Sequence, residues 1–498
     1  MWKVIFLIFF ANIASLYGDQ HSHDIRTRFI NQPLDHFNPF NRRNFDQRYI
    51  QNTEFFHDGG PIYIYLTVGE EYFGVYDTFI KSGLVYEIAE ETNGLLFALE
   101  HRYFGLSRPT EDTTFDNLQW LNIHQALADI ARFIAFVKEN TYGAENSRVI
   151  LWGRGYGGSL AIWSRLKYPN LVDGAWGSSS PLNAVLEHSQ TLVNAFTTIN
   201  NIGGPECGST IQEAFQILDE AFMTGNTSFI VERLRLCEEL DSSNIYDLAR
   251  IDYSIATDSY RFIQNARYPE IDEKCRIITG ADTPDNPPID ALDGFARWYI
   301  DDLNRHRDCF DYRNDVVVAM YSDPEWDSVS TIDGRRQKLW LQCTQLGGFP
   351  ITNEGTEHPY GRRFEIRFFR RWCADAFANE NFIDRWFMDD LIGQTNQHFG
   401  GLNPKIYRIL LTHGEMDPLR TLSALSDLNS QAKVHVINME SFSRDMGSPS
   451  EVQDYPHLLE VKGIIRDEIL GFIRAADEDQ PTTPPPNETP PPIEPGSY

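Results

Sequence analysis

Residues 149–168 combine a short apolar run with a cluster of glycines, and this combination restricts the local fold more than any other part of the chain. The run 149–152 (Val-Ile-Leu-Trp) predicts a buried strand, and residues 159–168 predict a helix. Only the segment Gly153-Arg154-Gly155-Tyr156-Gly157-Gly158 separates them. A reversal this tight needs small residues and holds its central residue, Gly155, in a strained backbone conformation.

Strands and helices alternate on both sides of this turn. Residues 61–66 and 94–99 predict strands, residues 125–139 predict a helix, and residues 407–412 predict a later strand. The alternation predicts an α/β fold with a mostly parallel sheet and helices on both faces. In an α/β-hydrolase a turn of pattern G-x-S-x-G is the nucleophile elbow, whose serine points at the substrate. Here the position of that serine is Gly155, which has no side chain to present.

A segment of different character, residues 186–334, lies between the two predicted parts of the hydrolase domain, 28–185 and 335–475. Its apolar residues recur at helical spacing from Ile211 to Phe222, residues 289–303 predict a further amphipathic helix, and four of the six cysteines lie within it. We predict a helical insertion domain, held by two disulfides, over the carboxyl edge of the sheet. The Pro-, Thr- and acid-rich sequence of residues 476–498 predicts a disordered tail.

The sequence of residues 1–18 predicts that the protein enters the secretory pathway. Residues 1–18 contain one cation, Lys3, then an apolar run and small residues, as in a cleaved signal peptide. Six cysteines in such a chain predict three disulfides, and the absence of a C-x-x-C pair argues against a zinc site. Asn226 begins a glycosylation sequon. We expect an extracellular or lysosomal glycoprotein with no metal and no cofactor.

The charge balance narrows the range of partners. Lys and Arg number 43 against 71 Asp and Glu, a formal net charge of -28. Such acidity excludes nucleic acid and anionic membranes as expected partners. It does not identify a ligand.

Five motifs occur in the order seen in one family of serine peptidases: residues 32–38, 100–107, 159–169, 340–344 and 414–418. The chain resembles the family that holds lysosomal Pro-X carboxypeptidase, dipeptidyl peptidases and thymus-specific serine protease, over residues 28–475. The resemblance implies an α/β-hydrolase with a helical domain inserted over the active site, and cleavage near chain ends, often at prolyl bonds. It also implies a disulfide between Cys343 and Cys373.

The resemblance places the family's catalytic triad on three positions. Its nucleophile falls on Gly155, its acid on Asp417, and its histidine on Phe442, because Ser-Phe-Ser-Arg-Asp-Met at residues 441–446 matches the family's S-H-C-x-D-M. Loss of the nucleophile or the base costs a triad about a millionfold in turnover. The sequence therefore predicts a catalytically inactive homologue. We expect Asp417, without its histidine, either to pair with a cation or to have a raised pKa through burial.

The predicted pocket residues are Tyr156, Gly69, Glu70 and Arg154, of which Arg154 stands where the family has glycine. The predicted ligands are peptides with accessible termini, including proline-containing ones. An inactive homologue could sequester them or serve as a regulatory subunit of an active relative. The expected assemblies are a homodimer or a heterodimer with a family member. A third interpretation is an interaction protein whose pocket has closed.

The rival interpretation is an active exopeptidase with a rebuilt triad of Ser159, His457 and Asp417. Ser159 lies four residues beyond the elbow position, about 6 Å along a helix, where a small residue packing helix on sheet is the better account. His457 lies fifteen residues beyond the matching position and is expected at the surface. A structural role is expected for His101 in the 100–107 motif.

Two weaker patterns remain. Glycines 153, 155 and 158 also fit the dinucleotide fingerprint G-x-G-x-x-G, but no acidic residue ends a strand about twenty positions later. If cleavage follows Gly18, the terminus Asp19-Gln20-His21 could bind Cu(II) or Ni(II). A disordered terminus is the simpler expectation.

Overall fold

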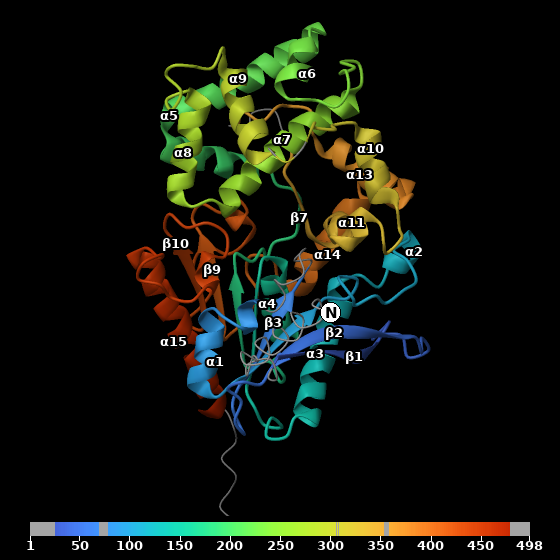
Figure 1. The fold of residues 1–498 in the computed structure, drawn as a ribbon. Coiled ribbons are helices and arrows are strands. Elements are labelled where there is room, and N and C mark those ends of the chain that lie inside the picture. The colour runs from blue at the N-terminus through green and yellow to red at the C-terminus, as the bar shows by residue number, and fades with distance from the viewer. Residues whose placement is uncertain (1–24, 69–77, 305, 307, 353–357, 479–498) are drawn as a thin grey trace, which may run out of the picture.

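A twisted eight-stranded sheet forms the lower part of the molecule in the computed structural model, which describes residues 25–68, 78–304, 306, 308–352 and 358–478 (Figure 1). Its strand order is β1-β2-β4-β3-β5-β6-β9-β10. The strands are β1 (Ile25–Pro33), β2 (Asn44–Asn52), β3 (Ile62–Thr67), β4 (Leu95–Glu100), β5 (Val149–Arg154), β6 (Gly174–Ser178), β9 (Ile409–Gly414) and β10 (Ala432–Ile437). Strands β1 and β2 pair antiparallel, and all strands from β4 to β10 in this order pair parallel. The predicted α/β class is confirmed.

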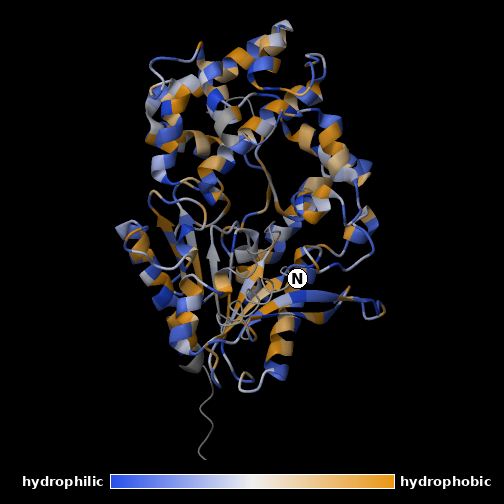
Figure 2. Cartoon of the chain, viewed as in Figure 1, coloured by the Kyte–Doolittle hydropathy of each residue, from blue (hydrophilic) through white to orange (hydrophobic). Residues whose placement is uncertain are grey.

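Helices cover both faces of the sheet because its central strands are apolar on both sides. Along β3, Ile62 and Ile64 pack on the face covered by α3 (Ile123–Asn140) and α4 (Tyr156–Lys167). Tyr63 and Tyr65 point the other way, toward α1 (Leu84–Thr92) and α15 (Pro456–Glu478). Successive strand side chains alternate between faces, so a strand buried on both appears as an unbroken apolar run. Figure 2 shows these central strands as largely hydrophobic.

The chain leaves the sheet after β6 and forms a helical part above it (Figure 1). Strand β7 (Val185–Glu187) marks the departure and pairs in parallel with β8 (Gly347–Phe349). The helices are α5 (Gln190–Thr224), α6 (Ser228–Arg233), α7 (Ile245–Asn265), α8 (Tyr268–Thr279), α9 (Ala291–Ala296), α10 (Asn314–Ser322), α11 (Val329–Ile332), α12 (Arg335–Leu341), α13 (Ile366–Phe377) and α14 (Phe387–Phe399). Two π-helical segments, η2 (Arg297–Leu303) and η3 (Gln342–Leu346), continue α9 and α12.

The helical part continues beyond the boundary expected at residue 334. Side chains of α12, α13 and α14, such as Trp340, Phe369 and Met388, join one apolar core with Leu248 and Phe295 of the earlier helices. The chain returns to the sheet only at β9. The boundary is set by side-chain packing between distant helices, which no local sequence pattern marks.

All six cysteines form disulfides. Cys207–Cys275 joins α5 to α8, and Cys237–Cys309 closes the segment between α6 and α10. Cys343–Cys373 joins η3 to α13. The expectation of three disulfides, two of them within 186–334, is confirmed, as is the pair that the family resemblance implied.

Several predicted features lie at or beyond the limits of the described residues. The signal peptide 1–18, the terminus Asp19-Gln20-His21, the pocket candidates Gly69 and Glu70, and residues 479–498 of the predicted tail lie outside them. Helix α15 extends to Glu478, past the tail boundary expected at 476. No helix in the described ranges has the length and apolar content needed to cross a bilayer.

Candidate functional site

The turn between β5 and α4 has the sharp geometry that its glycines predicted. Strand β5 ends at Arg154, and α4 begins at Tyr156. Gly155 between them has φ +51° and ψ −129°, a region that residues with a Cβ rarely adopt. Its N–H donates a hydrogen bond of 3.0 Å to the carbonyl of Ser178 at the end of β6. The elbow therefore lies at the carboxyl edge of the sheet.

The neighbouring glycines allow α4 to lie directly against the strands. A Cβ on Gly153 would come 2.6 Å from the carbonyl carbon of Gly157. A Cβ on Gly157 would overlap the carbonyl oxygen of Leu66, and one on Gly158 would overlap the hydroxyl of Ser180. Close packing of helix and sheet thus accounts for the glycines that also fit the dinucleotide fingerprint.

An aromatic ring lies over the apex of the elbow. A Cβ built on Gly155 would be 3.3 Å from Cζ and 3.7 Å from Cε2 of Phe442. The backbone N–H of Phe442 donates a 2.8 Å hydrogen bond to the carbonyl of Gln264, near the end of α7. The guanidinium carbon of Arg154 is 6.0 Å from the centre of the Phe442 ring. Neither Gly155 nor Phe442 has a side chain that can attack a carbonyl or accept a proton.

Asp417 is buried just beyond β9, with 1% of its surface exposed. Its Oδ1 accepts hydrogen bonds from the backbone N–H of Leu419 at 3.1 Å and from Nε2 of Gln264 at 3.2 Å. No described residue donates a hydrogen bond to its buried Oδ2. Burial raises the pKa of Asp417 to about 6 because desolvation outweighs these hydrogen bonds, the attraction of Arg420 and a contact with the Ser179 side chain, all of which lower it. Of the two outcomes expected for this residue, a raised pKa is confirmed.

The structure does not bring the alternative triad together. Ser159 is fully buried in α4, and its hydroxyl hydrogen-bonds to the carbonyl of Pro181 at 2.6 Å and to that of Gly155 at 3.2 Å. His457 lies at the start of α15 with its ring stacked on Tyr455 and Nε2 3.7 Å from a carboxylate oxygen of Glu440. Among the hydrogen bonds of the described residues, none joins Ser159, His457 and Asp417.

His101 contacts Tyr156, the first residue of the helix that follows the elbow. It is buried, and its Nδ1 is 2.7 Å from the carbonyl of Arg102, while Nε2 is 3.5 Å from the Tyr156 hydroxyl. Burial lowers the pKa of His101 to about 4, so the ring is neutral at physiological pH. The next residue, Arg102, forms a buried ion pair with Asp129 of α3. These contacts agree with the structural role expected for His101.

A cleft of 620 Å³ opens between the elbow and the helical part. Its wall is built by β5 and α4, by α7 and α10, and by the α12–η3 segment with α13. The lining residues are Val68, Arg154, Gly155, Tyr156, Tyr253, Arg261, Gln264, Asn265, Tyr321, Arg335, Lys338, Leu339, Leu341, Gln342, Leu346, Trp372 and Phe442. The cleft therefore brings together Arg154, Gly155, Tyr156 and Phe442 from the sequence prediction. The contributions of α7 and α12 were not predicted, because no local pattern shows that these helices meet the elbow.

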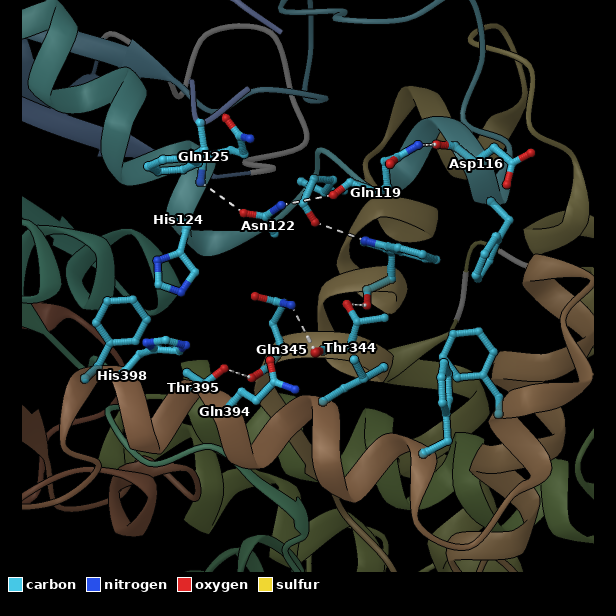
Figure 3. Close-up of a pocket in the computed structure, with 18 residues that line it drawn as sticks. Asp116, Gln119, Asn122, His124, Gln125, Thr344, Gln345, Gln394, Thr395 and His398 are labelled. Atoms are coloured by element: carbon cyan, nitrogen blue, oxygen red, sulfur yellow. Dashed lines mark hydrogen bonds between the residues drawn. The ribbon is translucent and has the colours of Figure 1, made fainter. Parts of the chain in front are cut away.

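A second cavity, of 670 Å³, lies on the other side of the α12–η3 segment. Trp340, Thr344 and Gln345 line it, whereas Leu339 and Gln342 of the same segment line the cleft. Figure 3 shows its lining side chains, among them His124 of α3 and His398 of α14, whose rings lie edge to face with their centres 4.6 Å apart. None of the predicted site residues lines this cavity.

Within the described residues, no group of three or more His, Cys, Asp or Glu side chains could hold a metal ion.

These features together define the α/β-hydrolase class: a mostly parallel sheet, a strained strand-to-helix turn at its carboxyl edge, a buried carboxylate after a later strand, and helices inserted above the sheet. Within this class, the family profile of serine carboxypeptidase S28 matches residues 32–465. The chain belongs to that family.

Named relatives span most of the chain. Thymus-specific serine protease of Mus musculus is 28% identical over 86% of this chain and 84% of its own length. Lysosomal Pro-X carboxypeptidase of Bos taurus is 36% identical over 78% of this chain and 77% of its own. Among solved structures, a proline iminopeptidase of Mycobacterium smegmatis aligns with 90% of this chain at 12% identity and a TM-score of 0.39.

Proposed function

We propose that this protein is a catalytically inactive S28 peptidase homologue of the secretory pathway that binds peptides in the cleft without cutting them. One observation carries the proposal: the apex of the elbow is Gly155, and the ring of Phe442 lies against it. A serine peptidase needs a hydroxyl there and a base within hydrogen-bond reach. Without them, an oxyanion hole and binding together retain at most about a thousandfold advantage over water.

The cleft supports the peptide-binding half of the proposal. Its volume of 620 Å³ lies within the usual range of about 300–1,000 Å³ for ligand pockets. The aromatic side chains of Tyr253, Tyr321 and Trp372 line it together with the amides of Gln264 and Asn265. Aromatic faces suit prolyl rings, and side-chain amides can pair with peptide N–H and C=O groups.

The relatives support the cellular setting. Relatives in several mammals are named lysosomal Pro-X carboxypeptidase, and all six cysteines are paired in disulfides, as is usual in the secretory pathway. We place this protein in the lysosome or outside the cell, with peptides as ligands.

The test uses the full chain purified from a eukaryotic secretory host. We expect no labelling of any serine by a fluorophosphonate, no hydrolysis of prolyl peptides, and measurable heat when a prolyl peptide is titrated in a calorimeter. Stoichiometric serine labelling would contradict the proposed inactivity and support the alternative hypothesis of a rebuilt triad. Absence of binding for a panel of peptides with free termini would contradict the peptide-binding half and favour a closed pocket.

A further inference from the structure

The cleft carries a charge opposite to that of the rest of the protein. Four cationic side chains line it, Arg154, Arg261, Arg335 and Lys338, and none of the described lining residues is Asp or Glu. The whole chain has 71 acidic residues against 43 basic ones. All the charged residues among the described lining are cations, on a protein of formal net charge -28, and this local charge selects for anions.

The four cations come from three sides of the cleft. Arg154 directly precedes the elbow apex at the end of β5. Arg261 lies on α7, and its side chain is exposed. Arg335 and Lys338 are three residues apart on α12, so they share a helix face. A carboxylate that enters the cleft would therefore meet positive charge from the sheet and from both helices.

Carboxylates outside the cleft offset part of two of these charges, and aromatic rings orient a third. The Nε of Arg335 is 2.5 Å from the carboxylate of Asp333, and Asp258 attracts the guanidinium of Arg261. The guanidinium of Arg154 lies near the rings of Phe79 and Phe442, with its carbon 5.8 Å and 6.0 Å from their centres. Rings at these distances can stabilise a guanidinium by cation–π attraction. They place the charge of Arg154 beside the ring that covers Gly155.

Resting on the proposed function, we propose that the peptides held in this cleft are acidic, with side-chain or terminal carboxylates bound by the four cations. Guanidinium groups match carboxylates in geometry, and each charge-assisted hydrogen bond is stronger than a neutral one. The aromatic residues Tyr253, Tyr321 and Trp372 favour a ligand with an organic body over a small inorganic anion.

The experiment compares two fluorescein-labelled prolyl peptides on the full chain by fluorescence anisotropy. One peptide carries several Asp and Glu residues and a free carboxyl terminus, and the other has Asn and Gln at the same positions and an amidated terminus. We expect the acidic peptide to bind at least about tenfold more tightly, since loss of one charge-assisted contact costs about 1.5–3 kcal/mol. Its affinity should fall as salt rises, because salt screens attraction to the cleft. Repulsion by the net charge alone would give the opposite salt dependence.

Variants locate the site. The double variant Arg154→Gln/Lys338→Gln should lose most of the preference for the acidic peptide. Arg276→Gln on α8, an exposed arginine outside the cleft, removes a positive charge elsewhere and should keep the preference. Thermal unfolding of each variant shows that it is folded, and binding of the neutral peptide provides a second check.

The outcomes separate the two proposals. Equal binding of both peptides overturns the acidic preference and leaves the peptide-binding proposal standing. Binding of neither peptide overturns both. A preference that survives in Arg154→Gln/Lys338→Gln as fully as in Arg276→Gln overturns the assignment to this cleft.

Discussion

The contact between Gly155 and Phe442 makes a quantitative prediction about restoring the nucleophile. In Gly155→Ser the new Cβ would be 3.3 Å from Cζ of Phe442, closer than the optimum of about 3.5–4.0 Å for two carbons. The serine would also adopt φ +51°, which costs a residue with a Cβ about 1–3 kcal/mol. Crowding against the ring adds a cost of about 1 kcal/mol or more. We expect a total loss of roughly 3 kcal/mol in the free energy of unfolding.

Replacing the ring separates these two costs. Histidine has a five-membered ring and lacks the para carbon that makes the closest contact, so Phe442→His removes the crowding and leaves the backbone strain. The cost of Gly155→Ser should therefore be about 1 kcal/mol smaller in the Phe442→His background than in the native one. The double variant also introduces a hydroxyl and an imidazole that face each other, and it is the variant expected to react with a fluorophosphonate.

The assay is guanidinium unfolding of the four proteins of this cycle, followed by tryptophan fluorescence. Trp152, Trp163 and Trp176 are buried in and around the sheet and report on the hydrolase part. A serine substitution that leaves stability unchanged would refute the strained elbow. An equal cost in both backgrounds would refute the contact with the ring.

Three further predictions concern other residues of the site. Burial raises the folded-state pKa of Asp417 to about 6 from an ordinary 3.8, so its contribution to stability falls as pH rises from about 4 to 6. Asp417→Asn should remove roughly 3 kcal/mol of this pH dependence, measured as the difference between the two profiles of unfolding free energy against pH. Parallel profiles would contradict this prediction. Ser159→Ala should cost about 1–2 kcal/mol of stability through its lost bonds to two carbonyls and leave fluorophosphonate labelling unchanged at background. Cys343→Ser/Cys373→Ser opens a loop whose ends are 30 residues apart and should lower the free energy of unfolding by about 3–4 kcal/mol. It should also weaken peptide binding, because Gln342 beside the disulfide lines the cleft, and unchanged affinity would contradict this link.

The elements that sequence analysis predicted well are those whose signal is local. Strands β3, β4, β5 and β9 are buried along nearly their whole length, so each appears as an apolar run. The elbow follows from glycines within six residues of one another. By contrast, β1 exposes most of its residues, among them Arg26 and Arg28, and has no apolar period that marks a strand. Its pairing with β2 is visible only in the folded sheet.

Arg154, Gly155 and Tyr156 were named because they are neighbours in the chain, and Phe442 was named only through the family resemblance. The contributions of α7 and α12 were missed because they depend on how distant elements meet. Gln264 donates to Asp417 across 153 residues of sequence, and its place depends on how α7 packs over the sheet. The cationic lining has the same origin, since Arg261 and Lys338 lie on helices whose approach to Arg154 is set by the shared apolar core. Neither residue has a sequence neighbour that indicates a site.

The proposed function treats Asp417 as a retained acid and Gly155 and Phe442 as altered positions, and the contacts of each side chain give a structural reason for this difference. The carboxylate accepts hydrogen bonds from Leu419 in its own turn and from Gln264 of α7, so it ties the loop after β9 to the helical part. Its loss would leave those partly buried donors unpaired, a cost that does not depend on catalysis. At the apex of the elbow, by contrast, the fold favours a residue without a side chain, because glycine relieves backbone strain and an aromatic ring fills the space above it. On the proposed function, Asp417 is kept because the fold needs its hydrogen bonds and not because of catalysis. Asp417→Asn keeps an oxygen acceptor for both donors and should preserve peptide binding. Asp417→Ala removes the acceptor and should weaken peptide binding.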